Sequence, residues 1–285
     1  MTVRSLLAIA TLSLATTTAA FAAEGTFNRN LSVGSSPNVS VATGSGNIHI
    51  HPGSDSQIHI VGHVHSSNNW FGADAESRVR QIVDNPPIVQ NGNDVTIGER
   101  HNNDLFRNIS IDYDIALPRA SNISAITGSG DLEVQDAGST LKAQTGSGGI
   151  RARGVTGAST LGTGSGDIDF QQNGSGDVRA ETGSGNISLR GVSGSLKSST
   201  GSGNINIQGQ LTAEWKVSTG SGNVELALGN GARFNLIADT GSGSVQVSQP
   251  ITMQGSLNRH HITGAVNGGG PTLHTNTGSG DITIR

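Results

Sequence analysis

Apolar and polar residues alternate along most of this chain in short runs. Residues 178–182 (Val-Arg-Ala-Glu-Thr) and 215–219 (Trp-Lys-Val-Ser-Thr) are two examples. A period of two is typical of a β-strand that buries one face. After a Gly-Ser-Gly segment, the alternation resumes with the opposite parity, as in Ile187-x-Leu189. The pattern therefore predicts pairs of short strands that are joined at glycine-containing corners.

One tetrapeptide, Thr-Gly-Ser-Gly, recurs at the end of these runs. The copies begin at Thr43, Thr127, Thr145, Thr163, Thr182, Thr200, Thr219, Thr240 and Thr277. From Thr127 to Thr219 the steps are 18, 18, 19, 18 and 19 residues, followed by 21 and then 37, which leaves room for one degenerate copy. A nearly fixed period predicts stacked repeats that share a continuous core. Strand parity places the threonine and the serine of each tetrapeptide on the inward side.

These patterns predict an all-β fold, a parallel β-helix or solenoid built of Thr-Gly-Ser-Gly rungs of about 18–20 residues. Residues 126–285 would form the repeats, and residues 23–125 a β-rich N-terminal capping region that is continuous with them. Residues 72–83 are the one segment here that favours a short helix, which Asn85-Pro86-Pro87 would end. Solenoids need such atypical ends to protect their edges.

The first residues resemble a secretory signal peptide. Arg4 precedes an apolar stretch, and Ala20-Phe21-Ala22 is a small-x-small cleavage site, so residues 1–22 are expected to be removed. The chain has no cysteine, which excludes disulfides and a lipid anchor on cysteine. We expect an exported protein, located in the periplasm or at the cell surface.

Two segments resemble a known family. Residues 113–118 (Tyr-Asp-Ile-Ala-Leu-Pro) and 123–134 (Ile-Ser-Ala-Ile-Thr-Gly-Ser-Gly-Asp-Leu-Glu-Val) look like the bacterial putative-adhesin family, a DUF4097-like β-solenoid. The resemblance covers roughly residues 25–285. It implies an exported β-solenoid with an adhesin-like function, and it supplies no catalytic or binding residues.

Five of the nine histidines lie at positions 49, 51, 59, 63 and 65. Alternation predicts that His49 and His59 point outward on neighbouring strands, where a pair of imidazoles could bind zinc or copper. No cysteine or fixed carboxylate completes the set, so exposed strand histidines are the preferred interpretation. Asn or Asp follows most tetrapeptides, which favours turn geometry or an Asx ladder over a calcium site. We expect no metal and no cofactor.

One outward row is rich in basic residues. Stacked rungs would align Lys142, Thr160, Arg179, Lys197, Lys216 and Asn235. Basic residues on strands protect against aggregation, which is the simpler interpretation. The alternative is a polyanion-binding strip formed by Lys142, Arg179, Lys197 and Lys216. The net charge of −4 argues against a general polyanion binder but allows a local strip.

These observations favour a non-enzymatic, adhesin-like envelope or cell-surface scaffold that binds an anionic polysaccharide or another envelope component. A polysaccharide lyase or hydrolase on a β-helix and a purely structural envelope protein remain alternatives. The serines and acids form no distinct catalytic pattern, so only fold analogy favours the enzyme. Because the chain ends directly after the last tetrapeptide, an uncovered final rung at Ile282–Arg285 would invite self-association.

Overall fold

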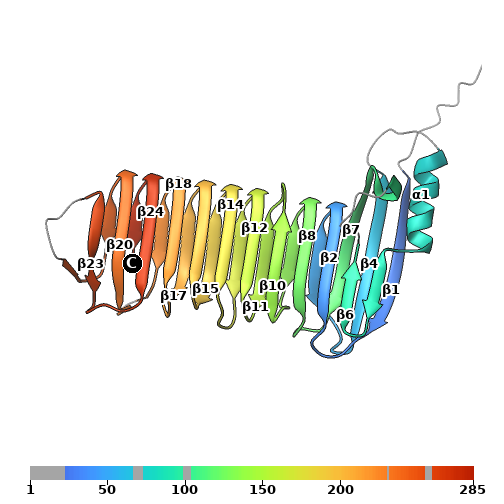
Figure 1. The fold of residues 1–285 in the computed structure, drawn as a ribbon, viewed down its shortest axis with the longest axis horizontal. Coiled ribbons are helices and arrows are strands. Elements are labelled where there is room, and N and C mark those ends of the chain that lie inside the picture. The colour runs from blue at the N-terminus through green and yellow to red at the C-terminus, as the bar shows by residue number, and fades with distance from the viewer. Residues whose placement is uncertain (1–22, 67–72, 99–103, 230, 254–258) are drawn as a thin grey trace, which may run out of the picture.

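The chain folds into an elongated column of two long β-sheets (Figure 1). The computed structural model describes residues 23–66, 73–98, 104–229, 231–253 and 259–285. The predicted signal peptide lies outside these residues. Sheet A has 12 strands and sheet B has 13. A single hydrophobic core lies between the two sheets.

Sheet A contains, in spatial order, β1 (Glu24–Ser32), β4 (Gln57–Ser66), β7 (Ile109–Leu117), β3 (Ile48–Pro52), β9 (Leu132–Gln135), β11 (Ile150–Val155), β13 (Ile168–Gln172), β15 (Ile187–Ser193), β17 (Ile205–Gln210), β19 (Val224–Ala227), β25 (Ile282–Ile284) and β21 (Val245–Val247). Sheet B contains β22 (Ile251–Met253), β23 (His261–Val266), β20 (Phe234–Ser242), β24 (Thr272–Ser279), β18 (Trp215–Ser221), β16 (Leu196–Ser202), β14 (Val178–Ser184), β12 (Ser159–Ser165), β10 (Thr140–Thr145), β8 (Asn122–Ser129), β2 (Asn38–Ser45), β6 (Asp94–Ile97) and β5 (Ile88–Asn91).

The tetrapeptides stack in register along sheet B. Thr182 is the ladder partner of Thr163 on one side and of Thr200 on the other, and the pairing is parallel. The same register links Thr43 to Thr127, so the first tetrapeptide belongs to the stack although it precedes the repeats by many residues. The predicted parallel β-solenoid is confirmed.

The threonine of each tetrapeptide points inward, as predicted, and bonds to the neighbouring rung. Thr200 is 5% exposed, and its Oγ1 donates to the carbonyl oxygen of Gly185 at 3.0 Å. Equivalent bonds recur along the stack, for example from Thr163 to Gly148 at 2.8 Å. Each hydroxyl therefore satisfies a backbone carbonyl at the corner, where the ladder alone leaves polar groups unpaired.

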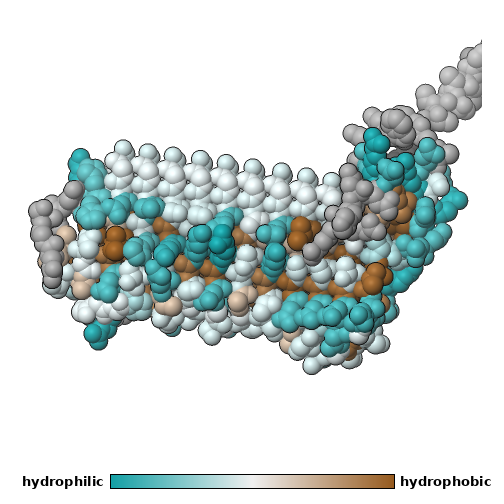
Figure 2. All heavy atoms as spheres, in the orientation of Figure 1, coloured by the Kyte–Doolittle hydropathy of each residue, from teal (hydrophilic) through white to brown (hydrophobic). Residues whose placement is uncertain are grey.

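The prediction that the serine of each tetrapeptide also points inward is wrong. Ser184 and Ser202 are exposed. Gly183 and Ser184 are both exposed, so the alternation ends at the threonine although β14 continues to Ser184. The second glycine completes the corner with a positive φ, 155° at Gly185. Figure 2 shows the result as an even ridge of near-white atoms along the upper edge of the column, where the strands of sheet B end in Figure 1.

Asn or Asp side chains follow the corner and form a second ladder. The Oδ1 atom of Asn186 accepts the backbone N–H of Asn204 at 3.0 Å, and Oδ1 of Asn204 accepts that of Asn223 at 2.9 Å. Asp167 does the same for Asn186 at 2.7 Å. Asn and Asp serve equally because only a side-chain oxygen is required, which supports the Asx-ladder interpretation of this row.

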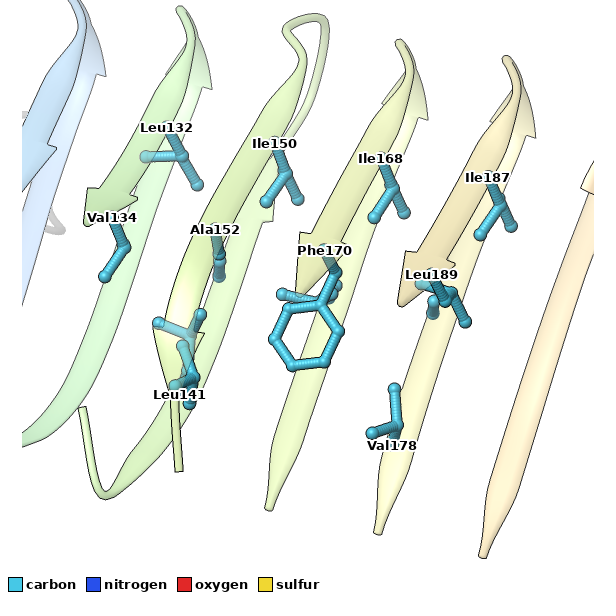
Figure 3. Close-up of a cluster of buried hydrophobic side chains, with 14 of the residues drawn as sticks. Leu132, Val134, Leu141, Ile150, Ala152, Ile168, Phe170, Val178, Ile187 and Leu189 are labelled. Atoms are coloured by element: carbon cyan, nitrogen blue, oxygen red, sulfur yellow. The ribbon is translucent and has the colours of Figure 1, made fainter. Parts of the chain in front are cut away.

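Small and medium apolar side chains fill most of the core. Figure 3 shows Ile150, Ile168 and Ile187 of sheet A in one layer, stacked along the column. The largest buried side chain among the described residues is Trp215, whose Nε1 donates to the carbonyl oxygen of Gly194 at 2.9 Å. Phe170 is also completely buried, so aromatic residues occupy the core despite their scarcity in the sequence.

The last strands of the chain lie inside the stack, which contradicts the predicted uncovered final rung. In sheet B, β24 pairs in parallel with both β18 and β20, and in sheet A β25 pairs with both β19 and β21. The segment between Thr240 and Thr277 forms β21, β22 and β23 instead of a degenerate rung, and β23 pairs antiparallel with β20. Self-association through the C-terminal rung therefore loses its structural basis.

The opposite end of the column has a different construction. There β4 pairs antiparallel with both β1 and β7, and the helix α1 (Ala73–Asp84) lies beside β1 (Figure 1). A short 3-10 helix, η1 (Asp104–Phe106), precedes β7. The helix α1 confirms the helix predicted for this segment. Its residues Val79 and Ile82 are buried, so α1 covers the edge of sheet A. The division of the chain near residue 125 stays a prediction.

Candidate functional site

The basic row runs across the outward face of sheet B. Lys142 pairs with Thr160, Thr160 with Arg179, Arg179 with Lys197, and Lys197 with Lys216. The structure thus brings all four predicted basic residues into one line. The row ends differently from the prediction, because Lys216 pairs with His274, and Asn235 pairs with Thr272 in another row. His274 enters the row because β24 lies between β18 and β20, and Asn235 leaves it because the stack aligns Thr240 with Thr277, which places Ile237 opposite His274.

Acidic side chains compensate part of the charge of this row. Glu181 lies between two of the cations, 2.8 Å from Nη2 of Arg179 and 3.3 Å from Nζ of Lys197. Glu214 lies 3.1 Å from Nζ of Lys216. Burial acts to raise the pKa of Glu181, but hydrogen bonds and charge interactions with the two cations outweigh it and lower that pKa. Asp177, two residues before Arg179, is a third carboxylate on this face, so three carboxylates flank four cations and a small excess of positive charge remains on the row.

A groove of about 650 Å³ lies along part of the basic row. Its lining extends from Asp94 on β6 to Lys197 on β16 and includes Lys142, Thr160 and Arg179. The groove crosses seven neighbouring strands, or six steps of about 4.8 Å, and is therefore roughly 29 Å long. A long open groove across strands suits an extended chain better than a compact small molecule.

The histidines lie on the outward face of sheet A, in an arrangement that differs from the prediction. His49 and His59 are not on neighbouring strands, because β7 lies between β3 and β4. His59 instead hydrogen-bonds Oδ1 of Asn30 at 2.6 Å. The residue that joins His49 is Asp114, whose Oδ2 lies 3.1 Å from His49 Nδ1, while its Oδ1 lies 3.0 Å from His51 Nε2.

The two imidazole rings influence the pKa of the Asp114 carboxylate. Partial burial acts to raise its pKa, whereas hydrogen bonds from His49 and His51 and the charges of the rings lower it. The net effect holds the pKa of Asp114 below its ordinary value. The sequence pattern does not single out Asp114, since its contact with the histidines depends on β7 entering the sheet beside β3. The only sequence signal was its outward position in an alternating run, Ile109–Leu117.

A third polar cluster has the connectivity of a catalytic triad. His261 Nδ1 bonds Oδ1 of Asp239, and its Nε2 lies 3.0 Å from Oγ1 of Thr263. The side chains of His261 and Asp239 are 52% and 51% exposed. Catalytic groups are activated by burial and a water-excluding site, and these open strand positions provide neither. The arrangement does not favour hydrolysis.

No helix in the described residues is both long and apolar enough to cross a bilayer. No curated protein sequence gives a significant match to the chain.

Two solved structures and one family model are similar to this chain. The crystal structure of a putative adhesin from Bacteroides fragilis NCTC 9343 is similar at a TM-score of 0.44 and 14% identity, covering 92% of this chain and 97% of that one. A putative cell adhesion protein from Clostridium sporogenes ATCC 15579 is similar at a TM-score of 0.26 and 14% identity, covering 91% and 99%. The family model described as Toastrack DUF4097 matches residues 37–285. Because this match spans most of the chain, the protein belongs to the Toastrack DUF4097 family.

Proposed function

We propose that this protein is an exported, non-enzymatic, adhesin-like scaffold that binds an anionic polymer, such as an acidic polysaccharide, along the outer face of sheet B. The observation that carries the proposal is the alignment of Lys142, Arg179, Lys197 and Lys216 beside the groove, three of them in its lining. A row of cations on a rigid sheet presents charge at fixed intervals, and a linear polyanion can contact several of them at once.

The expected binding is electrostatic. Arg179, Lys197 and Lys216 are 50%, 53% and 59% exposed, so their ion pairs with glutamates are solvated and worth little individually. A polymer with denser negative charge can therefore displace or outweigh these glutamates. The interaction would weaken strongly with salt, because exposed charges are screened over about 10 Å at 0.1 M ionic strength.

Heparin chromatography tests this proposal with a matched control. The strip variant changes Lys142, Arg179, Lys197 and Lys216 to Gln. The control variant changes four arginines on sheet A or at its end, Arg151, Arg153, Arg190 and Arg285, to Gln and so has the same net charge. We expect the strip variant to elute at clearly lower salt than both the wild type and the control. Equal elution of the two variants would refute a localised site and leave the row as protection against aggregation.

A second variant should change heparin binding by the same surface in the opposite direction. Glu181→Gln removes the carboxylate that neutralises Arg179 and Lys197. We expect it to elute from heparin at higher salt than the wild type. A lower elution salt would mean that Glu181 orders the two cations for binding instead of competing with the polymer.

Export is part of the proposal and has its own measurement. Cell fractionation followed by N-terminal sequencing should find the mature chain outside the cytoplasm, beginning at Ala23. A chain that retains residues 1–22 in the cytoplasm would contradict export, but it would not contradict polymer binding by the basic row.

A further inference from the structure

We infer that His49, His51 and Asp114 form a binding site for a divalent transition metal, of which zinc is the representative. The three side chains come from two neighbouring strands of sheet A. His49 and His51 are alternate outward residues of β3, and Asp114 is the direct ladder partner of His49 on β7. A potential ligand atom of each residue lies within 4.8 Å of those of the other two.

The rigid sheet holds this donor set together before any ion binds. The two imidazole rings have centroids 5.3 Å apart, and each has a nitrogen about 3 Å from an oxygen of Asp114, at 3.1 Å for His49 and 3.0 Å for His51. Zinc ligands at about 2.0–2.2 Å from the ion lie somewhat more than 3 Å from one another. Small side-chain rotations are therefore sufficient to direct the three groups at one ion.

The surroundings of the His49 ring decide which nitrogen would face the ion. Nδ1 lies beside the carboxylate of Asp114, so the ion would bind at Nδ1. Nε2 of the same ring points away from Asp114, is shielded from solvent and has no hydrogen-bond partner among the described residues. With the ion on Nδ1, Nε2 carries the proton of the neutral imidazole, which is the tautomer that metal binding at Nδ1 requires.

The donor chemistry selects the class of metal. Two imidazoles and one carboxylate suit zinc, nickel and copper, whereas calcium and magnesium prefer oxygen ligands. Glu133 on β9 is the ladder partner of His49 on the side opposite Asp114. The site is thus flanked by two carboxylates, which favour a cation, and three protein ligands leave a position open for water or for Glu133.

Calorimetric titration of the mature, tag-free chain with zinc chloride tests the inference. We expect one zinc per chain with micromolar affinity, little heat from magnesium, and at least a tenfold loss of affinity in both His51→Ala and Asp114→Asn. The matched control is His59→Ala, because His59 lies on the same face but is separated from His51 by Ala116 of β7, or two strand spacings of about 9.6 Å. This control should bind zinc like the wild type.

Thermal unfolding with and without zinc gives an independent measurement. Zinc should raise the melting temperature of the wild type and of His59→Ala, and it should leave that of Asp114→Asn unchanged. The inference is overturned if the wild type binds no zinc at micromolar concentrations. It is equally overturned if His59→Ala loses as much affinity as His51→Ala, which would indicate nonspecific binding by the histidine-rich surface.

Discussion

The first glycine of the tetrapeptide offers a sharp test of the stacking geometry. Gly146 and Gly44 occupy the same position of the motif, and neither has a positive φ. A Cβ atom on Gly146 would lie 2.4 Å from the carbonyl oxygen of Gly128 in the preceding rung. A Cβ atom on Gly44 would have nothing within 4 Å, because β6, which precedes β2 in the stack, ends at Ile97. The same substitution therefore meets backbone at one site and open space at the other.

The cost of Gly146→Ala follows from the displacement that it forces. Carbon and oxygen approach to about 3.3 Å, so the two rungs must separate locally by about 0.9 Å. The N–H of Gly146 bonds the oxygen of Gly128 at 3.1 Å, and this separation would break that bond. Overpacking of about 1–3 kcal/mol and a lost hydrogen bond of about 1 kcal/mol together predict a loss of roughly 2–4 kcal/mol in the free energy of unfolding.

Gly44→Ala should behave in the opposite way. Alanine restricts the unfolded chain without straining the fold, so we expect no loss, or a gain of up to about 1 kcal/mol. Urea unfolding followed by circular dichroism compares the two variants, and hydrogen exchange shows whether protection falls first near β8, β10 and β12. Similar unfolding midpoints for Gly146→Ala and Gly44→Ala would refute the argument that glycine is required here by contact between rungs.

Three further predictions concern the core, the histidine cluster and the order of the strands. Thr200→Val removes a buried hydroxyl that donates to Gly185 in the preceding rung, and it should lower the free energy of unfolding in urea by about 1–2 kcal/mol. Ser198→Ala removes a buried hydroxyl that has no partner in the described residues and should cost less. Because the pKa of Asp114 is lowered on folding, Asp114→Asn should reduce the melting temperature near neutral pH. The difference in melting temperature between wild type and variant should vanish as the pH falls through the folded-state pKa of Asp114, and a difference that persists in acid would contradict this. Deletion of residues 272–285 should expose β20 to β23 to limited proteolysis, since it removes their parallel neighbours β24 and β25; a protected segment would show that the C-terminal strands are dispensable.

The sequence by itself determined the local structure and the register. Alternation identified the strands, the segment before Asn85-Pro86-Pro87 gave the helix, and the spacing of the tetrapeptides aligned the basic row from Lys142 to Lys216. These features were predictable because they depend on interactions within one rung or between consecutive rungs. Period-two burial, proline stereochemistry and in-register pairing all act over such short distances.

Only the tertiary structure decided which strands become neighbours. Every rung presents nearly the same edge, so the repeat does not specify that β24 inserts between β18 and β20. The antiparallel strand β23 pairs with one edge of β20 and ends the parallel ladder there. The other edge of β20 pairs with β24, which belongs to the last rung. Likewise, β7 enters beside β3 and brings Asp114 to His49 from 65 positions away. Such long-range pairings depend on the packing of whole elements, so they cannot be predicted from the local pattern of residues.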